Sequence, residues 1–188
     1  MPSLPREQAA GFYHVTMRGV DRRAIFTGDE TRRIQLRTLA KVVRIRPVRC
    51  HAFCQMDNHF HLVLETLEDG ELAPVMQHLA SVYARTFNEL HARVGHLFER
   101  RYGSVPLQGE AHTLEVCRYV VLNPVRAGQC EAAEDWRWSN YRATVGLVTP
   151  PRFLTVEWTL ALFDADPIRA RVKYARFVAD AARLPRAA

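Results

Sequence analysis

Alternating apolar and polar positions predict four short strands in this chain. Phe12 to Arg18 alternates and is rich in aromatic and β-branched residues, so it predicts a first strand. Val48 to Met56 predicts a second strand, and the tight turn Asp57-Asn58 leads into an apolar third strand that begins at residue 59. Tyr102 to Leu107 is expected to form the fourth and shortest strand.

Apolar residues at helical spacing predict helices between these strands. The first helix runs to about Ile45, before Pro47 breaks the pattern, and either Asp29 or Thr31 could cap its start. The second is a long helix over Leu72 to Arg93. The resulting order is the ferredoxin-like split βαββαβ pattern. We therefore predict an α+β fold, with an antiparallel sheet and helices on one face of it.

A third helix is expected to follow the last strand. It covers His112 to Asn123, with Thr113 able to cap its start, and Pro124 ends or kinks it. Gly128 terminates the segment. Together with the sheet, this helix gives a domain over residues 1–145.

The end of the chain has a different pattern. Thr149-Pro150-Pro151 resembles a linker, and the helices expected after it cover Val156 to Phe163 and Ile168 to Leu184. Residues 146–188 are therefore expected to be a helical C-terminal extension. The sequence indicates no role for this extension.

Positive charge is concentrated at the start of the chain. Residues 1–50 hold eleven Lys/Arg against four Asp/Glu, whereas the remaining residues hold fifteen against sixteen. This distribution favours a nucleic-acid-binding surface in the first third of the chain. A GC-rich coding sequence would explain the preference for arginine over lysine, but not the concentration of charge in one segment.

The rest of the composition narrows the class of protein. No run approaches 18 apolar residues and the N-terminus lacks a secretory pattern, so no membrane partner and a cytoplasmic, nucleoid-associated location are expected. The cysteines lack the paired spacing of a structural zinc site and are expected to be buried free thiols. Cys50 and Cys54 have even spacing within one predicted strand, which would place them on the same face.

The motif His59-Phe60-His61 is the strongest chemical signal in the sequence. Because side chains alternate along a strand, His59 and His61 share one face with their Cα atoms about 6–7 Å apart. Two such imidazoles can converge on one metal ion. The alternative is a pair of hydrogen-bonded histidines at the end of a strand.

Tyr119 and Asn123 form a second candidate pair. They are four residues apart on the predicted third helix and so lie on one face. An amide oxygen is a hard ligand that suits Mg²⁺ or Mn²⁺. Taken alone, Tyr119 fits a core tyrosine with a paired hydroxyl better, and Asn123 fits an ordinary residue at the end of a helix before a proline.

Five ordered segments resemble the HUH single-strand endonucleases, specifically the IS200/IS605-like Y1 transposases and, among these, the REP-associated tyrosine transposases. The resemblance extends from about Phe12 to about Val145. The matching segments are Tyr13 to Gly19, Met56 to Thr66, Gly95 to Tyr102, Tyr119 to Gly128 and Trp138 to Arg142.

The resemblance implies the same ferredoxin-like fold and a metal-dependent reaction on single-stranded DNA. It implies that Tyr119 is the nucleophile that forms a 5′-phosphotyrosine link, and that His59, His61 and Asn123 hold Mg²⁺ or Mn²⁺. The implied partner is single-stranded DNA with a hairpin or palindromic repeats, bound by a monomer or homodimer. The expected DNA-binding residues are Arg18, Arg22, Arg23, Arg100 and Arg101.

Two alternatives stay open at this point. One is a non-catalytic protein of the same fold that binds hairpin or single-stranded nucleic acid. The other is a metal-binding or RNA-binding protein of ferredoxin-like fold with a structural Tyr119. Its mark would be exposed aromatic pairs on the central strands, for which Phe53 and Phe60 are the only candidates.

Overall fold

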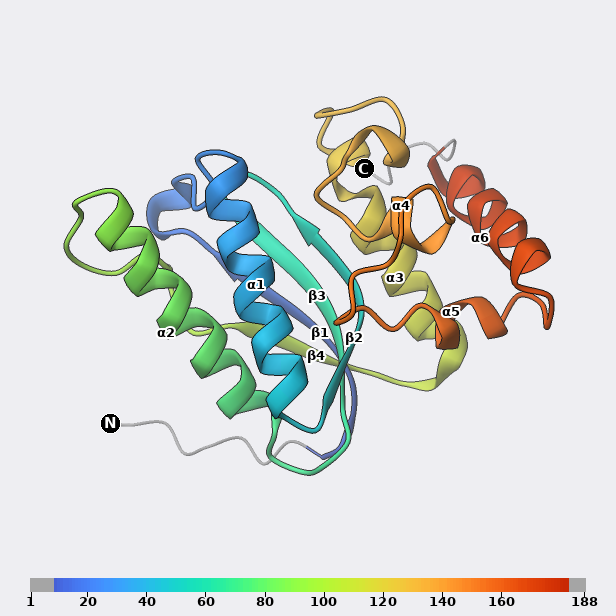
Figure 1. The fold of residues 1–188 in the computed structure, drawn as a ribbon, viewed down its shortest axis with the longest axis horizontal. Helices are drawn as coiled ribbons and strands as arrows, with labels where there is room; N and C mark the ends of the chain where they lie inside the picture. The colour runs from blue at the N-terminus through green and yellow to red at the C-terminus, as the bar shows by residue number, and fades with distance from the viewer. Residues whose placement is uncertain (1–8, 183–188) are drawn as a thin grey trace.

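The computed structural model describes residues 9–182 and contains one four-stranded antiparallel sheet (Figure 1). The strand order is β2-β3-β1-β4, in which every neighbouring pair is antiparallel. This order confirms the predicted ferredoxin-like α+β fold. The strands are β1 (Gly11–Arg18), β2 (Val48–Gln55), β3 (His59–Thr66) and β4 (Gly103–Leu107).

Helices cover both faces of the sheet. The helices α1 (Asp29–Ile45) and α2 (Leu72–Leu90) pack together on one face, as predicted, and α3 (Gly109–Arg126) lies on the other against β2 and β3 (Figure 1). The remaining elements are η1 (Val20–Arg22), η2 (Ala133–Asp135), α4 (Tyr141–Thr144), α5 (Glu157–Ala161) and α6 (Pro167–Ala182).

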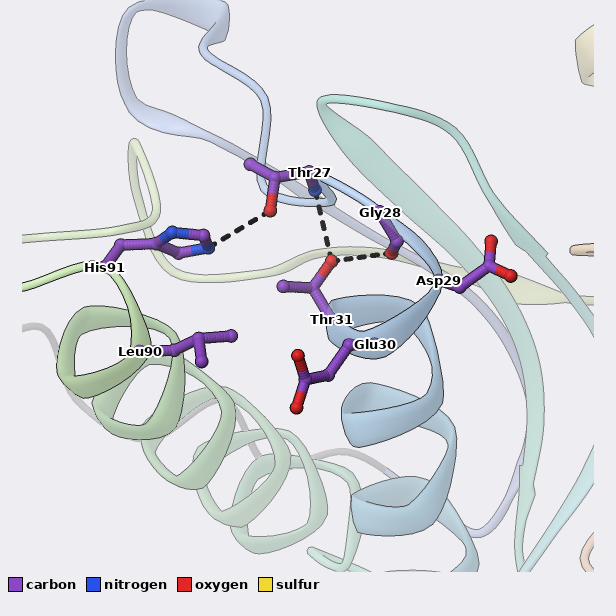
Figure 2. Close-up of a pocket in the computed structure, with 7 residues that line it drawn as sticks. All are labelled: Thr27, Gly28, Asp29, Glu30, Thr31, Leu90 and His91. Carbon is purple, nitrogen blue, oxygen red and sulfur yellow. Dashed lines mark hydrogen bonds between the residues drawn. The ribbon is translucent and has the colours of Figure 1, made fainter.

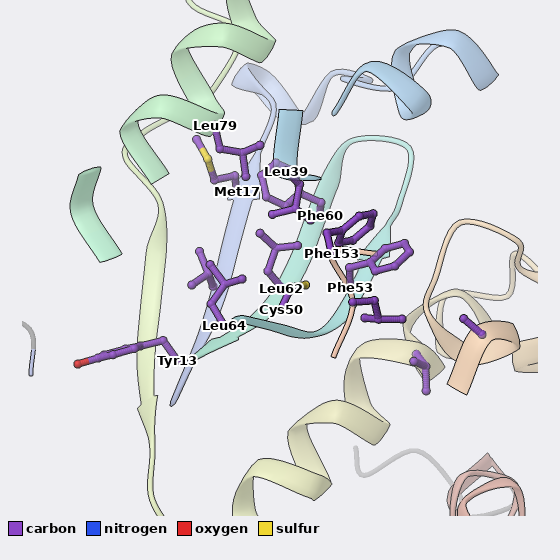
Figure 3. Packing of buried hydrophobic residues seen from close by; sticks show 14 of the residues in the cluster. Tyr13, Met17, Leu39, Cys50, Phe53, Phe60, Leu62, Leu64, Leu79 and Phe153 are labelled. Carbon is purple, nitrogen blue, oxygen red and sulfur yellow. The ribbon is translucent and has the colours of Figure 1, made fainter. Parts of the chain in front are cut away.

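The main core fills the space between the sheet and the helices α1 and α2, and it also includes residues of α3 and of the C-terminal part of the chain. Alternate residues of β1 and β3 point into it, and Figure 3 shows several of them around Leu39 of α1 and Leu79 of α2. Because strand side chains alternate, the intervening residues of these two strands face α3. The buried residues on the α1 and α2 side are Tyr13, Val15, Met17, Phe60, Leu62 and Leu64.

A bulge in β2 corrects the prediction for its two cysteines. The pairing of β2 with β3 shifts register between Cys50 and Ala52. One extra residue in a strand turns the side chains that follow it to the opposite face of the sheet. Cys50 therefore packs in the main core, whereas Cys54 packs on the α3 side. Both are buried, as is Cys117, and all four cysteines are free thiols as predicted, but Cys130 is only half-buried.

The third helix is longer than its sequence pattern predicts. It begins at Gly109, so Thr113 lies within the helix and donates a hydrogen bond to the Gly109 carbonyl instead of capping the start. It also continues through Pro124 to Arg126. Proline removes one N–H bond from a helix and its ring crowds the carbonyl four residues earlier. The helix nevertheless continues past Pro124, but only as far as Arg126.

The start of α1 is tied to the end of α2 at a shallow pocket (Figure 2). The helix begins at Asp29, and the Thr31 hydroxyl accepts the Thr27 N–H and donates to the Gly28 carbonyl. The Thr27 hydroxyl in turn bonds His91 Nε2 at 3.0 Å. These contacts fix the helix pair at one end of the sheet.

The predicted C-terminal extension packs against the rest of the chain. Leu154 forms a parallel bridge with Cys50 of β2, and the Thr155 N–H donates to the Cys50 carbonyl. Further along, α6 lies against α3 and buries Tyr174 and Val178. Residues from this part of the chain therefore share the main core with the sheet.

Candidate active site

The histidine pair lies on the face of β3 that α3 covers. His59 begins the strand, and the rings of His59 and His61 meet edge to face with their centroids 4.9 Å apart. Phe60 points the other way and is buried in the main core. Strand alternation therefore brings the two imidazoles together, as the spacing predicts.

Tyr119 of α3 packs against His61 and against His14 of β1. Its ring meets the edges of His61 and His14 at centroid distances of 5.8 and 5.9 Å. It remains 38% exposed, and the Arg126 guanidinium lies 5.2 Å from the ring centroid. A tyrosine that is packed against other rings and is still partly exposed can meet a bound molecule.

Asn123 lies one helical turn beyond Tyr119. Its side-chain N–H donates to the Tyr119 carbonyl at 2.9 Å, and the residue is half-buried. This bond occupies the amide nitrogen of Asn123, so the amide oxygen Oδ1 is the atom that could bind a metal ion. The structure therefore brings Tyr119, His59 and His61 together and attaches Asn123 to the tyrosine backbone. The roles of these four residues stay predictions.

The environment keeps both histidines neutral. Burial, followed by the nearby His59, His14 and Arg18, lowers the pKa of His61 to about 3. Burial, followed by the charge of Arg18, lowers the pKa of His59 to about 4. A neutral imidazole has the free lone pair that metal binding requires.

The side chains fit a divalent ion in part. His61 Nε2 is buried and has no hydrogen-bond partner, which is costly for a polar atom unless something binds it. Within residues 9–182, however, no group of three His, Cys, Asp or Glu side chains is placed to hold a metal. Any third protein ligand must therefore be of another type, such as the amide of Asn123.

Two basic segments, residues 18–23 and residues 97–101, lie beside the histidines. Val20 and Glu99 donate backbone hydrogen bonds to Leu97 and Arg18 respectively, which joins the loop after β1 to residues 97–99. The five arginines predicted to bind DNA come from these segments, and all are exposed; they are Arg18, Arg22, Arg23, Arg100 and Arg101. Arg18 is also the pairing partner of His59 in the sheet.

The basic first third of the chain does not form one surface. Its helical part is α1, which covers the sheet face opposite the histidines. Arg32 of this helix is only 6% exposed and pairs with Asp57 at 2.6 Å. Its guanidinium also donates to the Gln55 carbonyl, so this charge braces the turn before His59 and is not available to a ligand.

Two residues that contact the histidines were not predicted as site residues, although both lie in the segments that resemble the transposases. His14 Nε2 lies 3.0 Å from His61 Nδ1, and the Asn58 amide oxygen lies 2.7 Å from His59 Nδ1. His14 faces α3 by strand alternation, but its approach to His61 depends on the pairing register of β1 and β3. No local pattern specifies that register.

The two aromatic residues considered as a mark of RNA binding are packed in the core instead. Phe53 and Phe60 are 5% and 1% exposed in the main core, so neither is available to RNA. Trp136 donates its indole N–H to the Gln55 carbonyl, and Trp136 and Trp138 lie 5.4 and 5.5 Å from the Arg32 guanidinium. The RNA-binding alternative therefore loses the sequence feature that would have supported it.

Comparison with known proteins agrees with this fold and gives the family of the chain. The chain belongs to the IS200-like transposase family, whose profile, described as "Transposase IS200 like", matches residues 8–123. Among solved structures, a REP-associated tyrosine transposase bound to a REP hairpin superposes with a TM-score of 0.65 and 18% identity, over 82% of this chain and 92% of that one. No curated protein matches the chain. Within residues 9–182, no helix is long and apolar enough to cross a membrane.

Proposed function

We propose that this protein cleaves and rejoins single-stranded DNA through a covalent bond between Tyr119 and a 5′ phosphate. The observation that carries the proposal is the position of Tyr119. Its ring packs on His61 and His14, yet it is 38% exposed, next to a buried imidazole nitrogen without a partner. Membership in the IS200-like transposase family supports the same conclusion.

In the proposed reaction, the Tyr119 oxygen attacks the phosphorus of a phosphodiester. A phosphorus–oxygen bond to tyrosine forms as the bond to the 3′ oxygen breaks, and that oxygen leaves as a 3′ hydroxyl after taking a proton. Attack by another 3′ hydroxyl reverses the step and joins two strands without ATP. The covalent intermediate thus divides the exchange into two displacements of similar energy.

His59, His61 and Asn123 are the residues that would hold Mg²⁺ or Mn²⁺. When bound, such an ion polarises a non-bridging phosphate oxygen and lowers the barrier to attack. The protein's own contribution is to hold the two histidines neutral and fixed on a central strand. Its second contribution is to present Tyr119 from a helix packed on the same face of the sheet.

Hairpin DNA is the proposed substrate. The structurally similar transposase is bound to a REP hairpin, and the exposed arginines beside His59 offer a positive surface to a phosphate backbone. Arginine suits phosphate contacts and bidentate contacts to guanine. Arg18, Arg22 and Arg23 of one segment, with Arg100 and Arg101 of the other, are proposed to position the strand.

One observation favours a second function, which is hairpin binding without catalysis. The described residues lack a full set of ionisable metal ligands, and a site with two histidines and an amide is a weak one. Such a protein would keep the arginine surface and would make no covalent product. Both functions share the fold and the DNA partner, so the test must detect covalent chemistry.

The deciding experiment is a covalent-adduct assay. A 5′-labelled and a 3′-labelled hairpin with single-stranded flanks are each incubated with the protein and Mn²⁺, with Mg²⁺, or with EDTA, and run on a denaturing protein gel. We expect the 3′-labelled strand to migrate with the protein only when metal is present, because Tyr119 keeps the 5′ phosphate of that fragment. Binding in a gel-shift assay with no adduct under any condition would favour the non-catalytic function.

A further inference from the structure

The side-chain amide of Asn58 has its orientation determined by a backbone carbonyl. Its nitrogen donates to the Arg22 carbonyl at 3.0 Å, and a carbonyl can only accept. The amide oxygen is therefore the atom that lies 2.7 Å from His59 Nδ1. Since that oxygen is also only an acceptor, His59 must donate through Nδ1–H, and in the neutral ring the lone pair is then on Nε2.

The contact with His14 determines which ring nitrogen of His61 carries the proton. The two rings stack, with His14 Nε2 3.0 Å from His61 Nδ1, and one of these nitrogens must carry the proton. If His14 were the donor, the proton of neutral His61 would be on Nε2, which is buried and has no partner. A buried N–H without an acceptor costs about 1–3 kcal/mol. The proton therefore belongs on His61 Nδ1, and its lone pair is on Nε2.

We propose that Asn58 and His14 are positioning residues that fix His59 and His61 in the Nδ1–H tautomer, so that both histidines offer Nε2 to one ion. This inference rests on the proposed metal-dependent function. Metal-binding histidines usually donate their other ring N–H to a neighbouring group, which fixes the ring and the tautomer. Here the two neighbours come from the β2–β3 turn and from β1, outside the set of proposed ligands.

Asn58 also constrains the loop after β1, which carries Arg22 and Arg23. Its bond to the Arg22 carbonyl holds a backbone in which Asp21 and Arg22 have φ values of 51° and 57°. Residues other than glycine adopt this left-handed conformation only when their surroundings enforce it. The same amide therefore fixes the orientation of His59 and the conformation of the loop that carries Arg22 and Arg23.

The first test reads the tautomers directly, in metal-free protein. Long-range ¹H–¹⁵N spectra of uniformly labelled protein in EDTA at about pH 8 distinguish a protonated from an unprotonated ring nitrogen. We expect Nδ1–H and a bare Nε2 for both His59 and His61. In His14→Leu, His61 should lose this single tautomer while His59 keeps it as an internal control. A wild-type Nε2–H signal at either histidine overturns the assignment.

The second test measures Mn²⁺ affinity by calorimetry without DNA. His14→Leu removes the acceptor and should weaken binding about 10–100-fold, the usual effect of losing such a partner. His14→Gln places an amide oxygen near the former Nε2 position and should stay within about threefold of wild type. Equal affinity in the leucine variant, or equal loss in both variants, overturns the positioning role.

The two tests also separate this inference from the function on which it rests. Normal Mn²⁺ affinity with the wrong tautomers would remove the positioning role and leave the metal site intact. Correct tautomers in a wild-type protein that binds no Mn²⁺ would remove the proposed metal site instead. Thermal melting of both His14 variants checks that each is folded before its affinity is compared.

Discussion

Two single-oxygen deletions in this chain should have opposite effects, and together they test the proposed nucleophile. Tyr119→Phe removes a hydroxyl from a ring that is 38% exposed and that makes no hydrogen bond through this group within residues 9–182. Tyr83→Phe removes a hydroxyl that is buried in the main core and donates to the Ile25 carbonyl. The chemical change is the same, but only the first is at the site.

The structure gives an expected magnitude for each variant. Losing the Tyr119 hydroxyl breaks no internal bond, so the free energy of unfolding should change by less than about 0.5 kcal/mol. Losing the Tyr83 hydroxyl leaves the buried Ile25 carbonyl without its donor and should cost about 1–3 kcal/mol. For a chain of this length each kcal/mol lowers the melting temperature by about 2–4 °C.

The assay is the covalent-adduct gel with Mn²⁺, run beside thermal melts and hairpin gel shifts. Tyr119→Phe should melt like wild type, bind the hairpin normally and form no adduct. Tyr83→Phe should melt several degrees lower and still form the adduct at a temperature where it is folded. An adduct that persists in Tyr119→Phe would refute the assignment, and Tyr102, at the end of the neighbouring basic segment, would be the next tyrosine to test.

Three further predictions concern the metal, the arginine loop and pH. Alanine at His59 or His61 should abolish adduct formation, whereas Asn123→Ala should only slow it, because water can replace an amide ligand; normal activity in all three would refute the metal site. Replacing Arg22 and Arg23 with alanine should weaken hairpin binding and lower its salt dependence, because fewer counterions are released; unchanged affinity would remove this loop from the DNA surface. In EDTA, the free energy of unfolding in urea should fall as the pH drops from about 6.5 towards 4. In the unfolded chain the histidines protonate near pH 6.5, whereas in the folded protein burial lowers the pKa of His59 to about 4 and that of His61 to about 3. The His61 contribution should reach about 2.7 kcal/mol by about pH 4.5, and a flat profile would show that these rings are not buried as neutral groups.

The sequence predicts those parts of the site that depend on local periodicity. Alternation along β3 puts His59 and His61 on one face, and helical spacing puts Tyr119 and Asn123 on one side of α3. The strand and helix order then predicts the antiparallel sheet, which the structure confirms. These inferences need only the repeat of one element at a time.

The features that the sequence did not predict depend on how elements pair. The contact of His14 with His61 follows from the register of β1 against β3, and a shift of one residue would turn His14 to the other face. The facing of Cys50 and Cys54 was wrong because a bulge in β2 lies between them. Neither the register nor the bulge leaves a local mark in composition or spacing.

Arg32 illustrates a different limit of sequence-based inference. A basic residue on an amphipathic helix is usually exposed, and the charge count for residues 1–50 includes it as part of a binding surface. In the structure it is buried under the turn that precedes His59, where it pairs with Asp57 and lies 5.2 Å from the Phe26 ring centroid. Net charge therefore overestimates the surface available to DNA.

The histidines of the proposed site are more rigidly held than Tyr119. His59 and His61 lie on a central strand that is paired on both sides, and the turn before them is held by Arg32 and by Gln129, which both bond Asp57. Tyr119 packs its ring on His61 and His14 but is 38% exposed. A tyrosine that attacks one strand and later releases it to another must remain reachable by both. Fixed histidines and an accessible tyrosine therefore suit an enzyme whose metal site is formed before DNA arrives and whose nucleophile exchanges DNA ends.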